Sequence, residues 1–330
     1  MTVKRVLLIR FSSIGDIVLC SPVLRNLKTQ FPELHIDVLT KNSFAPVWKN
    51  NPFIDKLLIW EDPESSQTWK YESYDLIIDL HNNLRSRSVK WIRWDCPNIS
   101  ISKENFKKMG LVWTKNTHFS ATPITSRYDN LLKSIGISTD NFGLDFYGID
   151  SLPENVNLPN RFYAIALGGS YKTKQVPTEK YLEFLGTQNG DIPFVLLGGK
   201  ADVSTAKQIK SKFPDMCIDL CGILSLGASA NVVNRCVVLI SGDTGLAHIG
   251  AALGKSVMWI WGSTSPKLGM MSPQKPNGGE MISMEVQGLN CRPCSKLGYA
   301  ECPKGHFKCM DHNPRLWLEN LEKLTASALG

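Results

Sequence analysis

No run of about 18 apolar residues occurs in this chain of 330 residues, so the sequence predicts no transmembrane helix. Only four consecutive apolar residues follow the basic pair in Met1–Arg10, which is too short for a signal peptide. Internal repeats and low-complexity tracts are absent as well. With 43% hydrophobic and 20% charged residues, the composition excludes wholesale disorder, a coiled coil and a collagen-like fibre. The length suits two globular domains of about 150 residues each.

Two nucleotide-binding signatures are also missing. The turn after the first apolar run, Val6–Phe11, contains no G-x-G-x-x-G, so the dinucleotide fingerprint of nicotinamide and flavin enzymes is absent. Gly250–Ser256 resembles the phosphate-binding loop of ATPases, but it has one residue too few between its glycines and follows a helical segment instead of preceding one. The sequence therefore favours neither a dinucleotide-dependent enzyme nor an ATPase of this type.

Nine cysteines do not form the dense pattern of a small disulfide scaffold, and an odd number cannot pair completely within one chain. We therefore expect a reducing cytosol. Four cysteines gather near the C-terminus, with two histidines close by: Cys291, Cys294, Cys302, Cys309, His306 and His312. Thiolates grouped in this way can bind zinc, although the interval from Cys302 to Cys309 lacks the second tight knuckle of a common zinc ribbon.

The 37 basic and 30 acidic residues leave a formal charge of +7, and the excess is concentrated between His81 and Lys115. This window holds eight Lys or Arg against Asp95 and Glu104. A local positive field suits an anionic partner such as phosphate, acidic lipid or nucleic acid, and a solvated helix face is the alternative. Nucleic acid is disfavoured because no recognised binding module accompanies the charge.

Short apolar runs alternate with segments of helical spacing, which predicts an α/β fold of repeated β-α units around parallel sheets. The runs are rich in Val, Ile and Leu with little polar alternation, as expected of strands covered on both faces. The predicted strands are Val6–Phe11, His35–Thr40, Lys56–Trp60, Asp75–Leu80, Phe162–Leu167, Pro193–Leu197, Cys236–Ser241 and Ser256–Trp261.

A poorly periodic stretch, Asp140–Asn160, contains two glycines and two prolines and predicts a domain boundary. The final segment, Asn313–Ala328, has apolar residues at helical spacing and predicts a closing amphipathic helix. We therefore expect domains at 1–150 and 151–312, followed by a helix within 313–330. Domains with parallel sheets bind ligands at the carboxyl ends of their strands, so we expect a site in a cleft that both domains face.

The loop after the first predicted strand runs through Ser12, Ser13 and Gly15 to Asp16 at the start of a helical segment. Its hydroxyls and backbone N–H groups can bind an anion or a sugar, and Asp16 adds a carboxylate. The alternative is structural, with Asp16 in a first turn that the helix dipole favours and Ser13 as the cap.

Two loops of the second half carry similar signals. Gly168–Pro177 follows a strand and combines small residues with Lys172 and Lys174, which suits a phosphate cradle or, equally, a solvated surface turn. Asp202 lies just past a glycine turn, where it can accept hydrogen bonds from ribose hydroxyls or simply start a helix.

The strongest local signal is Ile240–His248, a strand that runs through a polar turn into a helix rich in Ala and Gly. Backbone N–H groups of Thr244, Gly245 and Leu246 would receive a diphosphate at the positive end of the helix dipole, and Gly245 permits close approach. Asp243, at the cap of this helix, should hold the turn rigid and not touch the anion. An ordinary capped helix with a packed His248 is the alternative.

Three segments in this order resemble those of the bacterial lipopolysaccharide heptosyltransferases, glycosyltransferase family 9, and the resemblance spans nearly the whole chain: Arg10–Asp16, Asp243–His248 and Gly262–Pro266. Heptosyltransferase II-like members are the most similar. The resemblance implies the GT-B fold, with two Rossmann-like domains whose parallel sheets face a central cleft. It further implies that the first domain binds the acceptor, the second binds the nucleotide sugar, and the C-terminal helix packs back toward the first.

The activity implied is an inverting, metal-independent transfer of a heptose or related sugar from ADP-heptose to a lipopolysaccharide core acceptor. Asp16 matches the proposed general base, and Lys174 matches a lysine that contacts the donor phosphates. The donor-binding residues implied are Ser170, Lys174, Asp202, Asp243, Thr244, Gly245, Leu246, His248 and Thr264. The acceptor-binding residues expected are Ser12, Ser13, Gly15, His81, Arg85 and Arg87.

The sequence departs from the family pattern at Val176, where tryptophan is usual, and at Asp202, where glutamate is usual. The donor's sugar and base therefore stay open. The alternatives are a transferase that uses another nucleotide sugar and a non-catalytic protein that binds a nucleotide sugar or a glycolipid. No cofactor is expected, since the ADP-sugar is a substrate. The cysteine segment has a counterpart in the family, so a metal-free structural loop is favoured over zinc.

The resemblance implies a partner for the basic window between His81 and Lys115. Arg85, Arg87, Lys90 and Arg93, interleaved with two tryptophans, follow the strand that ends near His81. We expect them to hold an anionic lipid-linked sugar at the inner face of the cytoplasmic membrane. The protein is accordingly expected to be cytoplasmic and peripherally associated with that membrane.

Overall fold

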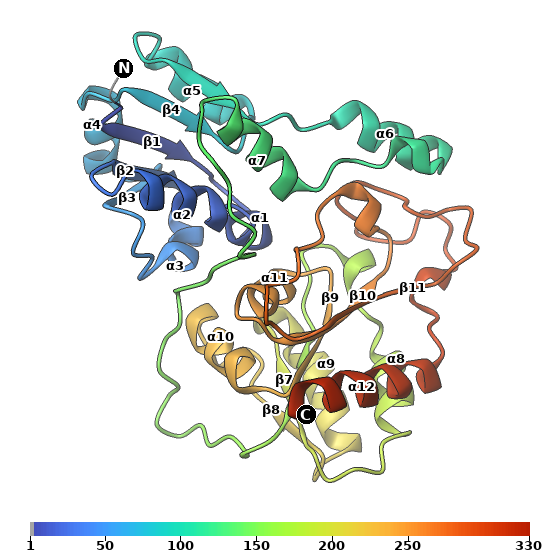
Figure 1. Cartoon of the computed structure of the whole chain (residues 1–330). Coiled ribbons are helices and arrows are strands. Elements are labelled where there is room, and N and C mark those ends of the chain that lie inside the picture. Colours follow the sequence, from blue (N-terminus) through green and yellow to red (C-terminus); the bar gives the residue numbers. More distant parts are fainter. Residues whose placement is uncertain (1–2) are drawn as a thin grey trace. The chain divides into compact units, whose positions relative to one another are not determined.

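The computed structural model describes residues 3–330, which fold into two compact units (Figure 1). The first unit contains the chain up to Glu104 together with Thr122–Gly148, and the second contains Asn105–Ala121 and Ile149–Gly330. The segment Asn105–Ala121, which the expected boundary places in the first domain, is fastened to the second unit. Its Lys115 Nζ donates to the Pro293 carbonyl oxygen at 2.7 Å, and the Ala121 N–H donates to the Lys267 carbonyl oxygen at 2.9 Å.

The first unit is built on a five-stranded parallel sheet with the order β3-β2-β1-β4-β5. The central strand β1 is covered on both faces, and Leu7, Leu8 and Ile9 have no exposed surface. The strands of the first unit are β1 Arg5–Ile9, β2 His35–Thr40, β3 Lys56–Ile59, β4 Leu76–Asp79 and β5 Asn98–Ser100. Its helices are α1 Ile14–Val18, α2 Ser21–Gln30, α3 Ala45–Trp48, α4 Pro63–Tyr71, α5 Leu84–Ile92 and α7 Ile124–Lys133.

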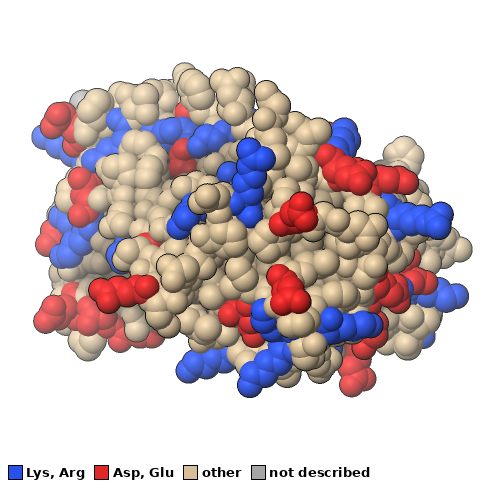
Figure 2. All heavy atoms as spheres, turned by 90° about the horizontal axis from the view of Figure 1, so that it is seen from below, with Lys and Arg blue, Asp and Glu red and all other residues tan. Residues whose placement is uncertain are grey.

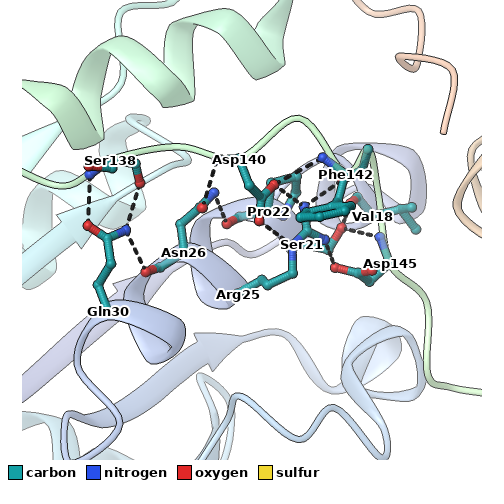
Figure 3. A network of polar contacts seen from close by, with 11 residues as sticks. Val18, Ser21, Pro22, Arg25, Asn26, Gln30, Ser138, Asp140, Phe142 and Asp145 are labelled. Carbon is teal, nitrogen blue, oxygen red and sulfur yellow. Dashed lines mark hydrogen bonds and ion pairs between the residues drawn. The ribbon is translucent and has the colours of Figure 1, made fainter. Parts of the chain in front are cut away.

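An irregular strap, residues 134–148, runs back along α2 and is held by polar contacts (Figure 3). Arg25 pairs with both Asp140 and Asp145, and its Nε lies 2.8 Å from Asp140 Oδ2. One turn further along α2, the Gln30 amide exchanges two hydrogen bonds with the backbone of Ser138, at 2.7 and 2.9 Å. These contacts fix α2, and with it the short helix α1 that precedes it.

The second unit is built on a six-stranded parallel sheet with the order β11-β10-β9-β6-β7-β8. Its strands are β6 Tyr163–Ala166, β7 Phe194–Leu197, β8 Cys217–Asp219, β9 Val238–Gly242, β10 Ser256–Trp261 and β11 Met281–Glu285. Its helices are α6 Asn105–Thr114, α8 Thr178–Leu185, α9 Val203–Lys212, α10 Leu226–Arg235, α11 Gly245–Ala252 and α12 Pro314–Leu329. Short 3-10 turns in the chain are η1 Asn42–Phe44, η2 Thr117–Phe119, η3 Lys172–Lys174, η4 Lys200–Asp202, η5 Pro266–Leu268 and η6 Lys308–Met310.

The closing helix α12 forms where the sequence predicts it. Asn313 caps it by accepting a hydrogen bond from the Arg315 N–H at 3.0 Å, and Pro314 occupies its first position. Trp317, Leu321 and Leu324 are buried in the core of the second unit. Helix α12 packs on helix α8 and on strands β9 and β10. The packing of α12 toward the first domain stays a prediction.

All eight predicted strands are present, with ends within two residues of the expected ones. The strands that the sequence did not predict, β5, β8 and β11, are outer strands of their sheets. Most of their residues are only half-buried or exposed, so they lack the continuous apolar run of a central strand. Within residues 3–330, no helix is both long enough and apolar enough to span a membrane.

Candidate functional site

Each sheet has one point where the strand order reverses, and ligands of open α/β sheets bind beside such points, at the carboxyl ends of the strands. In the first unit this point lies between β1 and β4, which lead to β2 on one side and β5 on the other. The loops that follow these two strands carry Asp16 and His81. The strand order therefore places Asp16 and His81 at this reversal, which we call the first switch point.

Asp16 lies in the first turn of α1, with its side chain 26% exposed and therefore open to a substrate. Its Oδ2 accepts hydrogen bonds from the Ser13 N–H at 3.1 Å and the Ser13 hydroxyl at 2.7 Å. Its Oδ1 lies 2.5 Å from Nη2 of Arg10. The predicted cap by Ser13 and the predicted carboxylate at the helix start thus occur together, and they orient Asp16 instead of removing it from solvent.

Arg10 is a buried cation beneath this carboxylate that the predicted site did not include. Its guanidinium donates to the Leu80 carbonyl oxygen and pairs with Asp16, so it links the ends of β4 and β1. Burial disfavours its charge, but Asp16 and, less strongly, Tyr128 outweigh burial and raise the pKa of Arg10. Arg10 therefore stays charged and holds Asp16 in place.

His81 lies across the switch point, with its ring edge on Phe11 at a centroid distance of 5.4 Å. Burial, followed by repulsion from Arg10, lowers the pKa of His81 to about 4. Its Nδ1 is buried, and no hydrogen-bond partner for it exists among the residues described. Burial and the same arginine also lower the pKa of Lys103, which the sequence placed only in the basic window. A neutral imidazole and a half-buried lysine thus line the site.

The basic window divides into structural and solvent-facing residues. Lys90 pairs with the buried Asp79 at 3.0 Å, and Arg93 is buried with its guanidinium 2.6 Å from the Glu72 carbonyl oxygen. Arg85 lies over the Phe11 ring, 5.6 Å from its centroid, and Arg87 is exposed. The expectation that all four hold an acceptor is therefore restricted to Arg85 and Arg87. On the face drawn in Figure 2, basic side chains likewise lie among acidic ones.

In the second unit the strand order reverses between β6 and β9. The turn after β6 carries Ser170 and Lys174, and the turn after β9 carries Asp243. Lys174 Nζ lies 2.6 Å from Asp243 Oδ2, which also accepts a hydrogen bond from the Thr264 hydroxyl at 2.9 Å. The prediction that Asp243 holds its turn rigid agrees with these contacts, and three predicted donor-side residues meet at one point. Ser170 is exposed in the same turn as Lys174.

Asp202 lies close to the same strand end. Its Oδ2 accepts a hydrogen bond from the Gly199 N–H at 2.8 Å. A Cβ atom at Gly168 would lie 2.7 Å from this oxygen, and a Cβ at Gly198 would lie 2.7 Å from the Cβ of Asp202. A Cβ at either position would require Asp202 to shift, so the glycines of both turns let Asp202 approach the end of β6.

Helix α11 begins at Gly245 with Thr244 as its N-cap residue, one position later than the cap expected at Asp243. The Thr244 hydroxyl lies 3.0 Å from the Ser241 hydroxyl, so it does not cap the helix with its own side chain. The N–H groups of the first turn, including those of Gly245 and Leu246, have no acceptor within the helix itself. His248 is buried one turn on, 2.9 Å from the Ser272 hydroxyl and edge-on to Trp259. Its contacts fit a packed histidine.

The loop after β10 carries Thr264 and is braced by Arg292, which was not among the predicted site residues. Its Nε donates to the Gly262 carbonyl oxygen at 2.6 Å, and its Nη2 donates to that of Thr264 at 2.8 Å. Its Nη1 pairs with Glu285 at 2.7 Å, and the arginine side chain is only 7% exposed. Arg292, between Cys291 and Cys294, therefore stabilises the loop that carries Thr264.

The rest of the cysteine segment packs on the turn η3. The Tyr299 N–H donates to the Thr173 hydroxyl at 2.7 Å, and the Thr173 N–H donates to the Tyr299 carbonyl oxygen at 3.1 Å. Cys291 Sγ lies 3.8 Å from His306 Nε2. Burial raises the pKa of Cys309 to about 12, which keeps this thiol protonated. Throughout residues 3–330, no three His, Cys, Asp or Glu side chains are arranged to hold a metal ion.

Residues 65–296 match the model of glycosyltransferase family 9 (heptosyltransferase), which is more than two thirds of the chain. The chain belongs to glycosyltransferase family 9. Among curated family members, lipooligosaccharide heptosyltransferase 2 of Haemophilus influenzae is 22% identical over 97% of this chain and 99% of its own length. Lipopolysaccharide heptosyltransferase 1 of Escherichia coli is 20% identical over 80% of this chain and 89% of its own length. The predicted family is confirmed.

Two solved structures establish the fold of this family 9 chain. A family 9 glycosyltransferase from Veillonella parvula has a TM-score of 0.73 at 19% identity, covering 98% of this chain and 97% of that one. The ADP-heptose lipopolysaccharide heptosyltransferase II of E. coli has a TM-score of 0.70 at 18% identity, covering 98% of both chains. The predicted GT-B fold is confirmed.

Proposed function

We propose that this protein transfers a heptose from ADP-heptose to a lipopolysaccharide core acceptor, with inversion at the anomeric carbon. The observation that carries the proposal is the pair of switch points. The first presents an oriented, accessible carboxylate, Asp16. The second presents a lysine, Lys174, beside the N-terminus of α11. A base for the acceptor and a positive site for a diphosphate are the two groups that such a transfer requires.

Asp16 acts as the general base in this proposal. The acceptor hydroxyl oxygen forms a bond to the anomeric carbon while the bond from that carbon to the ADP oxygen breaks. ADP leaves with the bonding electron pair, and the hydroxyl proton passes to the Asp16 carboxylate. Arg10 and Ser13 hold the carboxylate in one orientation, and the neutral His81 can contact an acceptor hydroxyl without adding charge beside Arg10.

The departing diphosphate is stabilised without a divalent ion. The Lys174 ammonium has three N–H donors, of which the Asp243 pair occupies one. The free N–H groups at the start of α11 add the positive end of the helix dipole. Asp202, next to Gly168, is available to hydroxyls of the donor nucleoside. Ser170 and Thr264 flank the same point, whereas His248, itself a residue of α11, is buried and holds the helix to Ser272.

The acceptor is proposed to be an anionic, lipid-linked sugar that Ser12, Ser13, Gly15, His81, Arg85 and Arg87 receive at the first switch point. A lipid-linked acceptor requires the protein to work at a membrane surface, which we propose to be the inner face of the cytoplasmic membrane. All nine cysteines are free thiols, and this agrees with a reducing compartment.

The direct test is turnover with defined substrates. Purified protein is incubated with ADP-heptose and a lipopolysaccharide core acceptor, ADP release is followed, and the anomeric configuration of the product is determined by NMR. The proposal predicts ADP release that depends on the acceptor and a product of inverted configuration. UDP- and GDP-sugars, tested in parallel, should be inactive. Donor binding without turnover on any core acceptor would instead support a binding protein.

A further inference from the structure

We propose that the outer face of α5 inserts into the interfacial region of a lipid bilayer. This surface consists of Leu84, Arg87 and Trp91 on α5 and Trp94 in the turn after it, and we call it the α5 face. The inference rests on the proposed function for its partner, since a lipid-linked acceptor lies in a membrane. It deepens that function by naming the part of the molecule that meets the lipid.

The α5 face exposes large apolar side chains to an unusual extent. Leu84 is 83% exposed, and Trp91 and Trp94 are each 84% exposed. Ile92, between the tryptophans, is 49% exposed. Tryptophan has a large apolar ring system that is mostly buried in folded proteins on average. Two of them left in water within one short segment indicate a surface that is covered when the protein works.

The spacing places the helical members of the α5 face on one side of α5. Residues three or four positions apart share a helix face, and Leu84, Arg87 and Trp91 follow this interval. Trp94 lies beyond the end of α5, in the turn that follows it, and is as exposed as Trp91. The opposite side is the packed one, where Ser86 and Val89 are fully buried. The buried side holds α5 on the sheet, so the α5 face is free to meet a partner.

The α5 face carries little charge. We therefore expect it to contact lipid through its apolar side chains. Lys90 is paired with Asp79, and Arg93 is paired with Asp95 and buried. Arg85 lies over Phe11, so Arg87 is the one basic side chain of the α5 face. A polybasic surface would bind anionic lipid through charge. Two exposed tryptophans instead suit the headgroup level of any bilayer, where the indole ring is apolar on its body and its N–H remains hydrated.

The position of α5 favours a membrane over a protein partner. The helix begins immediately after Asn83, its N-cap, two residues beyond His81 at the first switch point. Its first turn carries Arg85, which contacts Phe11 of the Asp16 loop. Helix α5 thus begins at the proposed acceptor site and contacts its loop through Arg85. A lipid-linked acceptor held there has its lipid in the surface that the tryptophans would enter.

The test compares vesicle binding of the full chain with that of the double variant Trp91→Ser, Trp94→Ser. Two vesicle types are used, phosphatidylethanolamine with phosphatidylglycerol, and phosphatidylcholine alone. The wild-type protein should sediment with both, and binding should fall less than about 3-fold in high salt. The double variant should show a partition coefficient at least about 30-fold lower. Phe142→Ser removes an aromatic that is 64% exposed outside α5 and should bind as the wild type does.

Four outcomes would overturn the proposal. Vesicle binding could persist in the double variant, or require phosphatidylglycerol and vanish in salt. It could depend instead on α6, which exposes Phe106 and Trp113 and is tested by Phe106→Ser, Trp113→Ser. The tryptophans could mediate self-association, shown by a dimer in sedimentation that the double variant lacks. Transfer to a deacylated, water-soluble acceptor is measured in parallel, because its failure rejects the proposed function and leaves the vesicle result standing.

Discussion

Lys174 Nζ lies 2.6 Å from Asp243 Oδ2, which joins the turn after β6 to the turn after β9 across the point where the second sheet reverses its strand order. Asp243 also accepts a hydrogen bond from Thr264, so the carboxylate is fixed from a third loop. The lysine is therefore oriented before a donor binds. Its remaining donors lie beside the first turn of α11, where backbone N–H groups need acceptors.

Replacing Lys174 tests this arrangement. Lys174→Ala should lower kcat by about 10²–10³-fold, because the charge that develops on the departing diphosphate loses its cation. Steady-state rates of ADP release give kcat, and calorimetry with ADP separates binding from catalysis. The matched control is Lys172→Ala, which removes an exposed lysine two residues away in the same turn. Equal losses in both variants would contradict the assignment.

Arg292 should be important for stability, because its removal takes the cation from Glu285, which keeps the Ser265 hydroxyl as a donor, and removes the Arg292 hydrogen bonds to the carbonyl oxygens of Gly262 and Thr264. Arg292→Met should reduce the free energy of unfolding by about 3–5 kcal/mol, as expected when one partner of a buried pair is lost. Urea unfolding measures this. Lys323→Met removes a more exposed pair with Glu280 and should change stability by about 0.5 kcal/mol or less. A similar small effect for Arg292→Met would show that the loop does not need its brace.

His81 predicts a pH dependence of stability with a definite sign. Its pKa is lowered to about 4 in the folded protein, against about 6.5 in the unfolded chain. Between these values the unfolded state binds a proton that the folded state does not, so stability falls as the pH is lowered from 7 toward 4. From pH 7 to pH 5, the wild type should lose about 1 kcal/mol more than His81→Gln in urea unfolding, after allowance for partial exposure. Parallel pH profiles would contradict the burial of a neutral imidazole.

Removal of divalent metal should leave the transfer rate unchanged, because Lys174 and the first turn of α11 supply the positive charge at the diphosphate. The measurement is activity after prolonged dialysis against EDTA and phenanthroline.

Elemental analysis of the protein before dialysis tests the cysteine segment separately. One tightly held zinc per chain would show that Cys291, Cys294, Cys302 and Cys309 form a metal site and would reject the metal-free loop.

The central strands could be predicted because they are covered on both faces and therefore form continuous apolar runs, such as Ser256–Trp261. The outer strand Met281–Glu285 could not, since half-buried residues interrupt its pattern. The excursion Asn105–Ala121 was also missed. Its place in the second unit depends on backbone contacts, such as that of Ala121 with Lys267, which leave no periodic signal in the sequence.

The candidate site shows the same division. Asp16, Lys174 and Asp243 follow predicted strands directly, so topology alone brings them to strand ends. Arg10 and Arg292 act through buried contacts with carbonyl oxygens and carboxylates, and the sequence does not distinguish them from surface arginines. A weak signal for Arg10 existed, because it opens the same segment that contains Asp16. The four arginines and lysines around α5 looked equivalent until their partners were known.

The central claim is that Asp16 takes the proton of the acceptor hydroxyl. The most direct measurement is single-turnover transfer by Asp16→Asn, with Asp129→Asn as control, a carboxylate of the same unit on α7. The account predicts a rate lower by about 10²–10⁴-fold for Asp16→Asn, with ADP affinity unchanged and the control fully active. A rate for Asp16→Asn equal to that of the wild type would contradict it.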